Sequence, residues 1–147
     1  MSENNHSAEL FDYIAGIKNK KTAVIGAGIS NRPLIKLLLS AGMDVTVCDM
    51  KEPDKITPDD LELISRGAKY RLGESYLDNL DFDLIFRTPG LMPFDSRLKA
   101  AADRGAVITS EMEAFLACSR TRNICITGSD GKTTTSTIIA ELLKAAG

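Results

Sequence analysis

The chain has 147 residues, of which 44% are hydrophobic and 26% are charged, and its formal net charge is −2. These values are typical of a globular protein, and they argue against a nucleic-acid-binding surface and against a disordered tail. No apolar run approaches the length that a membrane span needs, and the polar N-terminus does not resemble a secretory signal.

The three cysteines, Cys48, Cys118 and Cys125, are odd in number and far apart in the sequence. Because no C-x-x-C pair occurs, they predict neither a disulfide framework nor a zinc site. We expect reduced, mostly buried thiols in a cytoplasmic protein.

The first structural unit is a strand, a helix and a second strand. After an amphipathic lead-in helix over residues 8–18, the pattern predicts a buried strand over 22–25 and a turn at Gly26-Ala27-Gly28. A helix follows, capped by Ser30 or Asn31 and ended by Gly42, and the next strand ends in Asp49. A carboxylate about twenty residues past the glycines is typical of a nucleotide-binding βαβ unit.

The identity of the ligand stays open at this point. A dinucleotide fingerprint needs a third glycine where Asn31 stands, so Gly26 and Gly28 alone are a weak signal for a nicotinamide cofactor. They indicate instead that a phosphorylated group approaches the helix N-terminus. The alternatives are a nicotinamide-dependent oxidoreductase domain and a tight turn without any ligand.

Further strands and helices alternate down to residue 117. We expect strands near 69–73, 82–86 and 106–109, and helices near 61–67, 95–104 and 110–116, the last of which begins with a capping box of Ser110 and Glu113. The alternation predicts an α/β fold with a Rossmann-like, doubly wound, parallel five-stranded sheet. The turn Thr88-Pro89-Gly90 follows the fourth strand, at the sheet edge where ligands bind in such folds.

The last part of the chain carries a glycine loop before a helix. A short strand over 124–126 is expected to lead into Thr127-Gly128-Ser129-Asp130-Gly131-Lys132-Thr133-Thr134-Thr135, and a helix is expected from 137 to 146. In such a loop the backbone N–H groups surround phosphates, Lys132 contacts the outer phosphates and the Thr133 hydroxyl binds Mg²⁺. Only Ser129 and Asp130 separate the two glycines, so the loop is shorter than the general pattern.

The motifs appear in an order that resembles the Mur ligases, the ATP-dependent amide ligases of peptidoglycan precursor synthesis, and most closely those that add D-glutamate. The resemblance rests on four segments and on the short phosphate loop. The segments are Val24-Ile25-Gly26-Ala27-Gly28-Ile29-Ser30, Val47-Cys48-Asp49, Thr88-Pro89-Gly90, and Ser110-Glu111-Met112-Glu113-Ala114-Phe115. Two positions differ from the family's usual pattern, because Asp130 stands in place of Asn and Thr88 in place of Ser.

The resemblance implies a division of the chain and a set of binding residues. It implies a Rossmann-like domain for UDP-N-acetylmuramoyl-L-alanine over residues 1–118, a linker over 119–122, and the start of a P-loop ATPase domain over 123–147. The implied substrate-binding residues are Gly28, Ile29, Ser30, Asp49, Lys51, Thr88, Pro89 and Gly90. The implied ATP-binding residues are Gly128, Ser129, Asp130, Gly131, Lys132, Thr133 and Thr134, with Lys132 as catalytic residue and Thr133 as Mg²⁺ ligand.

The resemblance also implies a bacterial, cytoplasmic enzyme with ATP and Mg²⁺ as cofactors, UDP-N-acetylmuramoyl-L-alanine and D-glutamate as substrates, and no nucleic-acid or membrane partner. An L-alanine-adding member of the family is the nearest alternative. We expect the chain to be the front piece of a longer protein and to be inactive by itself. Because one strand and one helix cannot bury their own apolar faces, we also expect residues 123–147 to fold onto the first domain or to associate with another chain.

Overall fold

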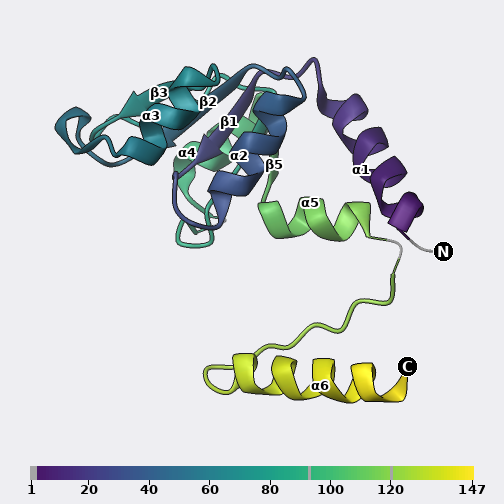
Figure 1. Cartoon of the computed structure of the whole chain (residues 1–147). Helices are drawn as coiled ribbons and strands as arrows, with labels where there is room; N and C mark the ends of the chain where they lie inside the picture. Colours follow the sequence, from purple (N-terminus) through teal and green to yellow (C-terminus); the bar gives the residue numbers. More distant parts are fainter. Residues whose placement is uncertain (1–2, 93, 120) are drawn as a thin grey trace.

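The computed structural model describes residues 3–92, 94–119 and 121–147, and it describes side chains from residue 9 onward. Within these residues the strands are β1 (Thr22–Ile25), β2 (Val45–Asp49), β3 (Lys69–Leu72), β4 (Leu84–Phe86) and β5 (Val107–Thr109). The helices are α1 (Glu3–Ile17), α2 (Asn31–Ser40), a short 3₁₀ helix at Pro53–Lys55, α3 (Pro58–Ser65), α4 (Ser96–Asp103), α5 (Glu111–Cys118) and α6 (Lys132–Ala146). Figure 1 shows their arrangement.

The five strands form one parallel sheet in the order β3-β2-β1-β4-β5. In the register, Thr22 at the start of β1 pairs with Val45 on one side and with Leu84 on the other. This order matches the first five strands of the Rossmann order 3-2-1-4-5-6. The predicted α/β fold with a doubly wound, parallel five-stranded sheet is therefore confirmed.

Helices and a long loop cover the two faces of the sheet. On one face, Val24, Val47 and Phe86 pack against buried side chains from α1, α2, α3 and α5. On the other face, Ala23, Ile25 and Ile85 pack against α4 and the segment 77–82. All four residues of β1 are buried, as expected for a central strand that is covered on both sides.

Helix α5 begins differently from the prediction. The Ser110 hydroxyl accepts a hydrogen bond of 3.2 Å from the Glu113 N–H, but the side chain of Glu113 does not return a bond to Ser110, so the capping box is only half formed. The complete, reciprocal box occurs at α3, between Thr57 and Asp60. Glu113 also lines a pocket that is described below.

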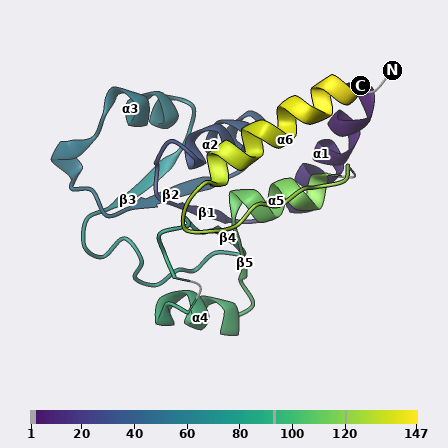
Figure 2. The same ribbon diagram turned by 90° about the horizontal axis from the view of Figure 1, so that it is seen from below.

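The C-terminal segment also differs from the prediction. Residues 122–128 form neither a helix nor a strand, so the expected strand over 124–126 is absent, and no neighbouring strand is there to pair with it. Helix α6 begins earlier than predicted, at Lys132, and Figures 1 and 2 show an extended segment between α5 and α6. Its large apolar side chains are exposed (Ile138 by 55% and Leu142 by 65%), so this segment does not fold onto the first domain.

Two further observations concern the thiols and the membrane. Cys48 is buried, Cys118 is half-buried and Cys125 is exposed, so the prediction of mostly buried thiols holds only for the first. Among the described residues, no helix combines the length and the apolar character that crossing a membrane would need.

Candidate functional site at the edge of the sheet

The loops after β1 and β4 meet at the carboxyl edge of the sheet. Gly26 has a φ of +83°, and a Cβ atom placed there would lie 3.6 Å from the Cβ of Thr88. After β1 the chain continues to β2, on one side of the β1–β4 pair, and after β4 it continues to β5, on the other side. This edge is therefore the switch point where ligands bind in open α/β sheets. The structure thus brings the predicted residues of the glycine loop next to the Thr88 turn.

A pocket of about 460 Å³ opens beside this meeting point. The loops after β1 and β4 and the start of α5 line it, and its lining residues are Ser30, Asn31, Arg87, Pro89, Ser110, Glu111, Met112 and Glu113. Two predicted substrate-binding residues, Ser30 and Pro89, are therefore pocket residues. The segment from Ser110 to Glu113, which carried part of the family resemblance, forms another wall.

The glycine loop leaves three backbone donors unused. In the part of the chain that the structure describes, the N–H groups of Gly28, Ile29 and Ser30 donate no hydrogen bond, and all three residues are exposed. They immediately precede the N-terminus of α2, where the helix dipole favours negative charge. Such a set of backbone donors is suited to bind an anionic group such as a phosphate.

Asn31 occupies the position of the third glycine of a dinucleotide fingerprint. Its side chain is 3% exposed, and its Nδ2 donates to the carbonyl oxygens of Ile25 (2.9 Å) and Gly26 (3.0 Å). The extra side chain is therefore placed inside the loop and bonded to its backbone. Ser30 is the residue before α2, but its hydroxyl makes no capping bond.

The carboxylate of Asp49 holds the glycine loop rather than facing freely outward. One oxygen accepts a hydrogen bond of 2.8 Å from the Ala27 N–H, and the other accepts one of 3.0 Å from the Lys51 N–H. The end of β2 and the turn after β1 are thereby fixed to each other. The sequence predicted the position of Asp49 at this edge but not its bond to the loop.

The amine of Lys51 has a buried partner. Its Nζ lies 2.8 Å from Oδ2 of Asp60, whose side chain is fully buried, while the Lys51 side chain is 20% exposed. Burial raises the pKa of the Asp60 carboxyl, but hydrogen bonds from Lys51, Thr57 and Tyr70 outweigh it and hold that pKa at about 2. Burial and the neighbouring Asp60 charge raise the pKa of the Tyr70 hydroxyl.

Arg87 is a pocket residue that the sequence analysis missed. It is half-buried, it lines the pocket together with Ser30, and its guanidinium donates a long hydrogen bond of 3.4 Å to the Leu91 carbonyl. No ion pair of this arginine occurs among the described residues. Its place directly before the Thr88 turn, at the end of a predicted strand, is the signal that could have identified it.

The phosphate-type loop before α6 has the backbone that its glycines predicted. Gly128 and Gly131 have positive φ values of +150° and +76°, and Thr135 N–H bonds the Gly131 carbonyl, so the first turn of α6 leaves free N–H groups at its start. The Lys132 amine bonds the carbonyls of Gly128 and, at 3.2 Å, Ser129. This loop lies apart from the sheet in Figure 1, and the structure does not bring Lys132 to the pocket.

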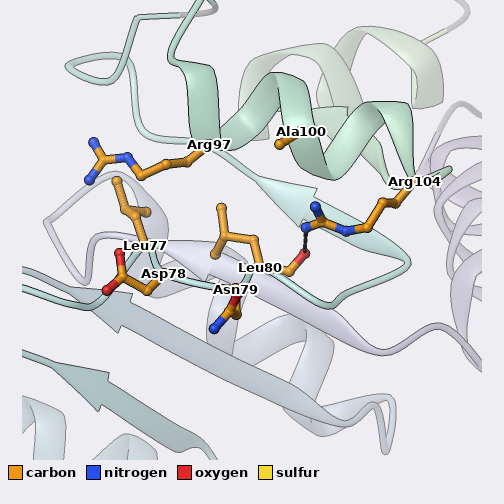
Figure 3. Close-up of a pocket in the computed structure, with 7 residues that line it drawn as sticks. All are labelled: Leu77, Asp78, Asn79, Leu80, Arg97, Ala100 and Arg104. Atoms are coloured by element: carbon orange, nitrogen blue, oxygen red, sulfur yellow. Dashed lines mark hydrogen bonds between the residues drawn. The ribbon is translucent and has the colours of Figure 1, made fainter.

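A second hollow, of about 370 Å³, lies on the other face of the sheet between the segment 77–80 and α4 (Figure 3). Its two arginines already have partners. Arg97 pairs with Asp95 at 2.7 Å, and Arg104 donates to the Leu80 carbonyl at 3.3 Å. None of the predicted site residues lines this hollow, so the switch-point pocket is the candidate site.

Comparison with known proteins identifies similar sequences. No family model matches the chain. The chain is 48% identical over 132 residues to UDP-N-acetylmuramoylalanine–D-glutamate ligase of Ruminiclostridium cellulolyticum, which is 89% of this chain and 28% of that protein. The protein of the same name from Clostridium botulinum is also 48% identical over 132 residues, and this chain covers 29% of it. The chain thus spans less than a third of the length of these curated relatives.

A solved structure is similar in fold. The murein peptide ligase from Psychrobacter arcticus matches with a TM-score of 0.53 and 25% identity, over 86% of this chain and 26% of that one. The similarity in sequence and the similarity in fold therefore point to the same group of ligases. The resemblance to the Mur ligases is confirmed, and this chain corresponds to an N-terminal portion of the members named UDP-N-acetylmuramoylalanine–D-glutamate ligase.

Proposed function

We propose that the first domain, residues 1–118, binds the nucleotide end of UDP-N-acetylmuramoyl-L-alanine at the carboxyl edge of its sheet. The observation that carries this proposal is the set of unused N–H groups of Gly28, Ile29 and Ser30 beside a pocket that contains Arg87. A diphosphate there would gain backbone donors, a helix N-terminus and a positive side chain together. The Thr88-Pro89-Gly90 turn would close the pocket, and the uridine would lie near Asp49 and Lys51.

In the longer protein, this binding serves an ATP-dependent ligase that adds D-glutamate. The terminal phosphoryl group of ATP passes to the carboxylate of the L-alanine unit, giving an acyl phosphate and ADP. The amine of D-glutamate then attacks the acyl carbon, phosphate leaves, an amide forms, and the amine loses a proton. The names of the relatives support the D-glutamate reaction over the L-alanine one.

The loop from Gly128 to Thr134 belongs to the ATP site of this enzyme. Its positive-φ glycines and the free N–H groups at the start of α6 fit phosphate oxygens. The Thr133 hydroxyl would supply an oxygen ligand to a Mg²⁺ ion, and that ion would offset the negative charge of the phosphates. Lys132 must release the carbonyls of Gly128 and Ser129 before its amine can contact the outer phosphates.

The chain by itself is expected to be inactive, because D-glutamate selectivity and further magnesium ligands belong to parts of the ligase that this sequence does not contain. We place the enzyme in the bacterial cytoplasm, without nucleic-acid or membrane partners. Amide formation by the purified 147-residue chain would contradict the expected inactivity. The boundaries at 118 and 122 also remain proposals, and limited proteolysis between these positions would test them.

The proposed ligand is tested by thermal unfolding with UDP-N-acetylmuramoyl-L-alanine, UDP, NAD⁺ and Mg·ATP in parallel. A ligand at a hundred times its dissociation constant stabilises the folded state by about 2.7 kcal/mol, which raises the midpoint by several degrees. We expect a shift with both uridine compounds and none with NAD⁺. A shift with NAD⁺ alone would contradict this proposal and would favour a nicotinamide-dependent oxidoreductase domain.

A further inference from the structure

We propose that Asn31 and Arg32, the first two residues of α2, act as positioning residues that aim the free N–H group of Gly28 in the glycine loop at the diphosphate. This inference rests on the proposed function and deepens it. The two side chains together hold three successive carbonyl groups of the loop, those of Ile25, Gly26 and Ala27. We call these contacts the carbonyl clamp.

The Asn31 part of the clamp is buried. Its Nδ2 lies 2.9 Å from the Ile25 oxygen and 3.0 Å from the Gly26 oxygen, so both amide protons are used. A glycine at this position, as in a dinucleotide fingerprint, could make neither bond. The same Nδ2 atom would lie 3.9 Å from a Cβ atom built on Gly26, so the side chain packs closely against the turn.

Arg32 holds the next peptide of the glycine loop, the one between Ala27 and Gly28. Its Nε donates to the Ala27 oxygen at 2.9 Å, while Nη1 of the same guanidinium pairs with Asp59 on α3. The Arg32 side chain is 26% exposed. The contact with α3 therefore helps to hold the guanidinium in place.

Because a peptide unit is planar, a contact that holds its carbonyl group also fixes the direction of its N–H group. In a trans peptide the C=O and the following N–H point in opposite directions. The Gly26 N–H then meets the Cys48 carbonyl at 2.8 Å, and the Ala27 N–H meets Asp49 at 2.8 Å, so these two peptides are held on both sides. The next peptide is held on its carbonyl side by Arg32, and its Gly28 N–H is left unbonded.

This geometry explains why a lost clamp would weaken anion binding without unfolding the sheet. The peptide between Ala27 and Gly28 could rotate once Arg32 no longer holds it, and the Gly28 N–H would then point in many directions. Binding would have to order that peptide again, which lowers affinity. The uridine lies elsewhere on the edge of the sheet in the proposed complex, so its binding would be unaffected.

The test compares Asn31→Ala and Arg32→Met with Lys36→Met as matched control. Lys36 lies one turn further along α2, and its loss removes the same charge, but its amine pairs with Glu62 and does not touch the loop. Calorimetric titration gives the dissociation constants of UDP and of uridine for each folded variant. We expect at least a tenfold weaker UDP affinity in both clamp variants, less than a threefold change in Lys36→Met, and unchanged uridine affinity throughout.

A second readout follows the donor itself. On titration with UDP, the amide proton of Gly28 should shift downfield in the unaltered chain, and this shift should be lost in Arg32→Met. Equal UDP affinity in the unaltered chain and in a folded clamp variant would overturn the inference, and so would an equal loss of uridine affinity. If Asn31→Ala does not fold, Arg32→Met is compared with Asp59→Asn, which removes the charged partner of Arg32 on α3 but leaves the Arg32 side chain that bonds Ala27. UDP affinity should then fall further in Arg32→Met than in Asp59→Asn.

Failure of the proposed function can be told apart from failure of the clamp. If the unaltered chain does not bind UDP, the proposed function is wrong, and hydrogen exchange without any ligand still tests the clamp. The amides of Gly26 and Ala27 should then exchange at least tenfold faster in Asn31→Ala than in Lys36→Met. Equal exchange rates in these two variants would overturn the clamp.

Discussion

The fully buried carboxylate of Asp60 accepts a hydrogen bond of 2.8 Å from the half-buried amine of Lys51. The same carboxylate accepts bonds from the N–H and hydroxyl of Thr57, at 2.9 and 2.8 Å, and from the hydroxyl of Tyr70, at 3.1 Å. These residues come from the segment after β2, from the start of α3 and from β3. One carboxylate therefore holds together three segments at the edge of the sheet.

Replacing Asp60 by alanine should destabilise the fold strongly. The change leaves the Lys51 amine partly buried without its counter-charge and removes the acceptor of the Thr57 and Tyr70 donors, so we expect a loss of about 2–4 kcal/mol in the free energy of unfolding. Urea denaturation at pH 7 measures it. The control is Glu62→Ala, which removes a half-buried partner of Lys36 and Arg66 whose side chain is 40% exposed, and this change should cost less than about 1 kcal/mol. Equal losses in the two variants would contradict the role of Asp60.

The same carboxylate predicts an acid-dependent stability. Its folded pKa of about 2 is below the value of about 3.9 for an unfolded aspartate. The folded state therefore binds the proton less readily, so the stabilisation is present above about pH 4 and is lost as the pH falls towards 2. Between pH 6 and pH 2.5 the free energy of unfolding should fall in both proteins. The fall should be smaller in Asp60→Asn than in the unaltered chain by at least about 1 kcal/mol. Parallel curves for the two proteins would show that another group controls the acid transition.

The sheet could be predicted from the sequence because its signals are local. Except for β3, with its Lys69 and Arg71, each strand is a short, mostly apolar run, and a glycine or proline lies within a few residues of every strand. The prediction was wrong at Ile124–Ile126 for a related reason. An apolar run predicts a strand only where a neighbouring strand can pair with it, and here none does.

The candidate site was predicted only in part because its contacts join distant segments. The pattern placed Ser30, Asp49 and Pro89 at the correct edge of the sheet. It could not show that Asp49 bonds Ala27, since this bond spans 22 positions in the sequence, or that Arg87 turns into the pocket. The ligand contacts of these residues stay predictions.

Gly26→Ala should weaken both the fold and the loop. The φ of +83° at Gly26 is unfavourable for a residue with a Cβ atom and costs about 1–2 kcal/mol, whereas the 3.6 Å approach to Thr88 is an ordinary contact. Thermal unfolding should show a loss of that size. Gly16→Ala is the control, because Gly16 lies in α1 with open space around it, and alanine there should be neutral or slightly stabilising. A neutral Gly26→Ala would mean that the loop relaxes to another conformation.

Arg87→Ala should reduce the affinity for UDP while leaving the fold intact. The guanidinium has no ion pair to lose among the described residues, so the free energy of unfolding should change by less than about 0.5 kcal/mol. A charge-assisted bond to phosphate contributes about 1.5–3 kcal/mol, so the dissociation constant should rise by roughly tenfold or more. Calorimetric titration measures this rise. Arg97→Ala, in the hollow of Figure 3, is the matched control and should leave UDP binding unchanged.

Residues 123–147 should cause the chain to self-associate. Ile138 and Leu142 lie one turn apart on α6 and are 55% and 65% exposed, and Leu143 beside them is 57% exposed. Apolar side chains gathered in this way favour association, since monomers seldom leave such a face in water. Light scattering after gel filtration should show particles of more than one chain, whose share grows with protein concentration. Leu142→Glu should restore the monomer, whereas Glu141→Gln, which changes charge but not the apolar face, should not. A monomer at all concentrations in the unaltered chain would exclude this association.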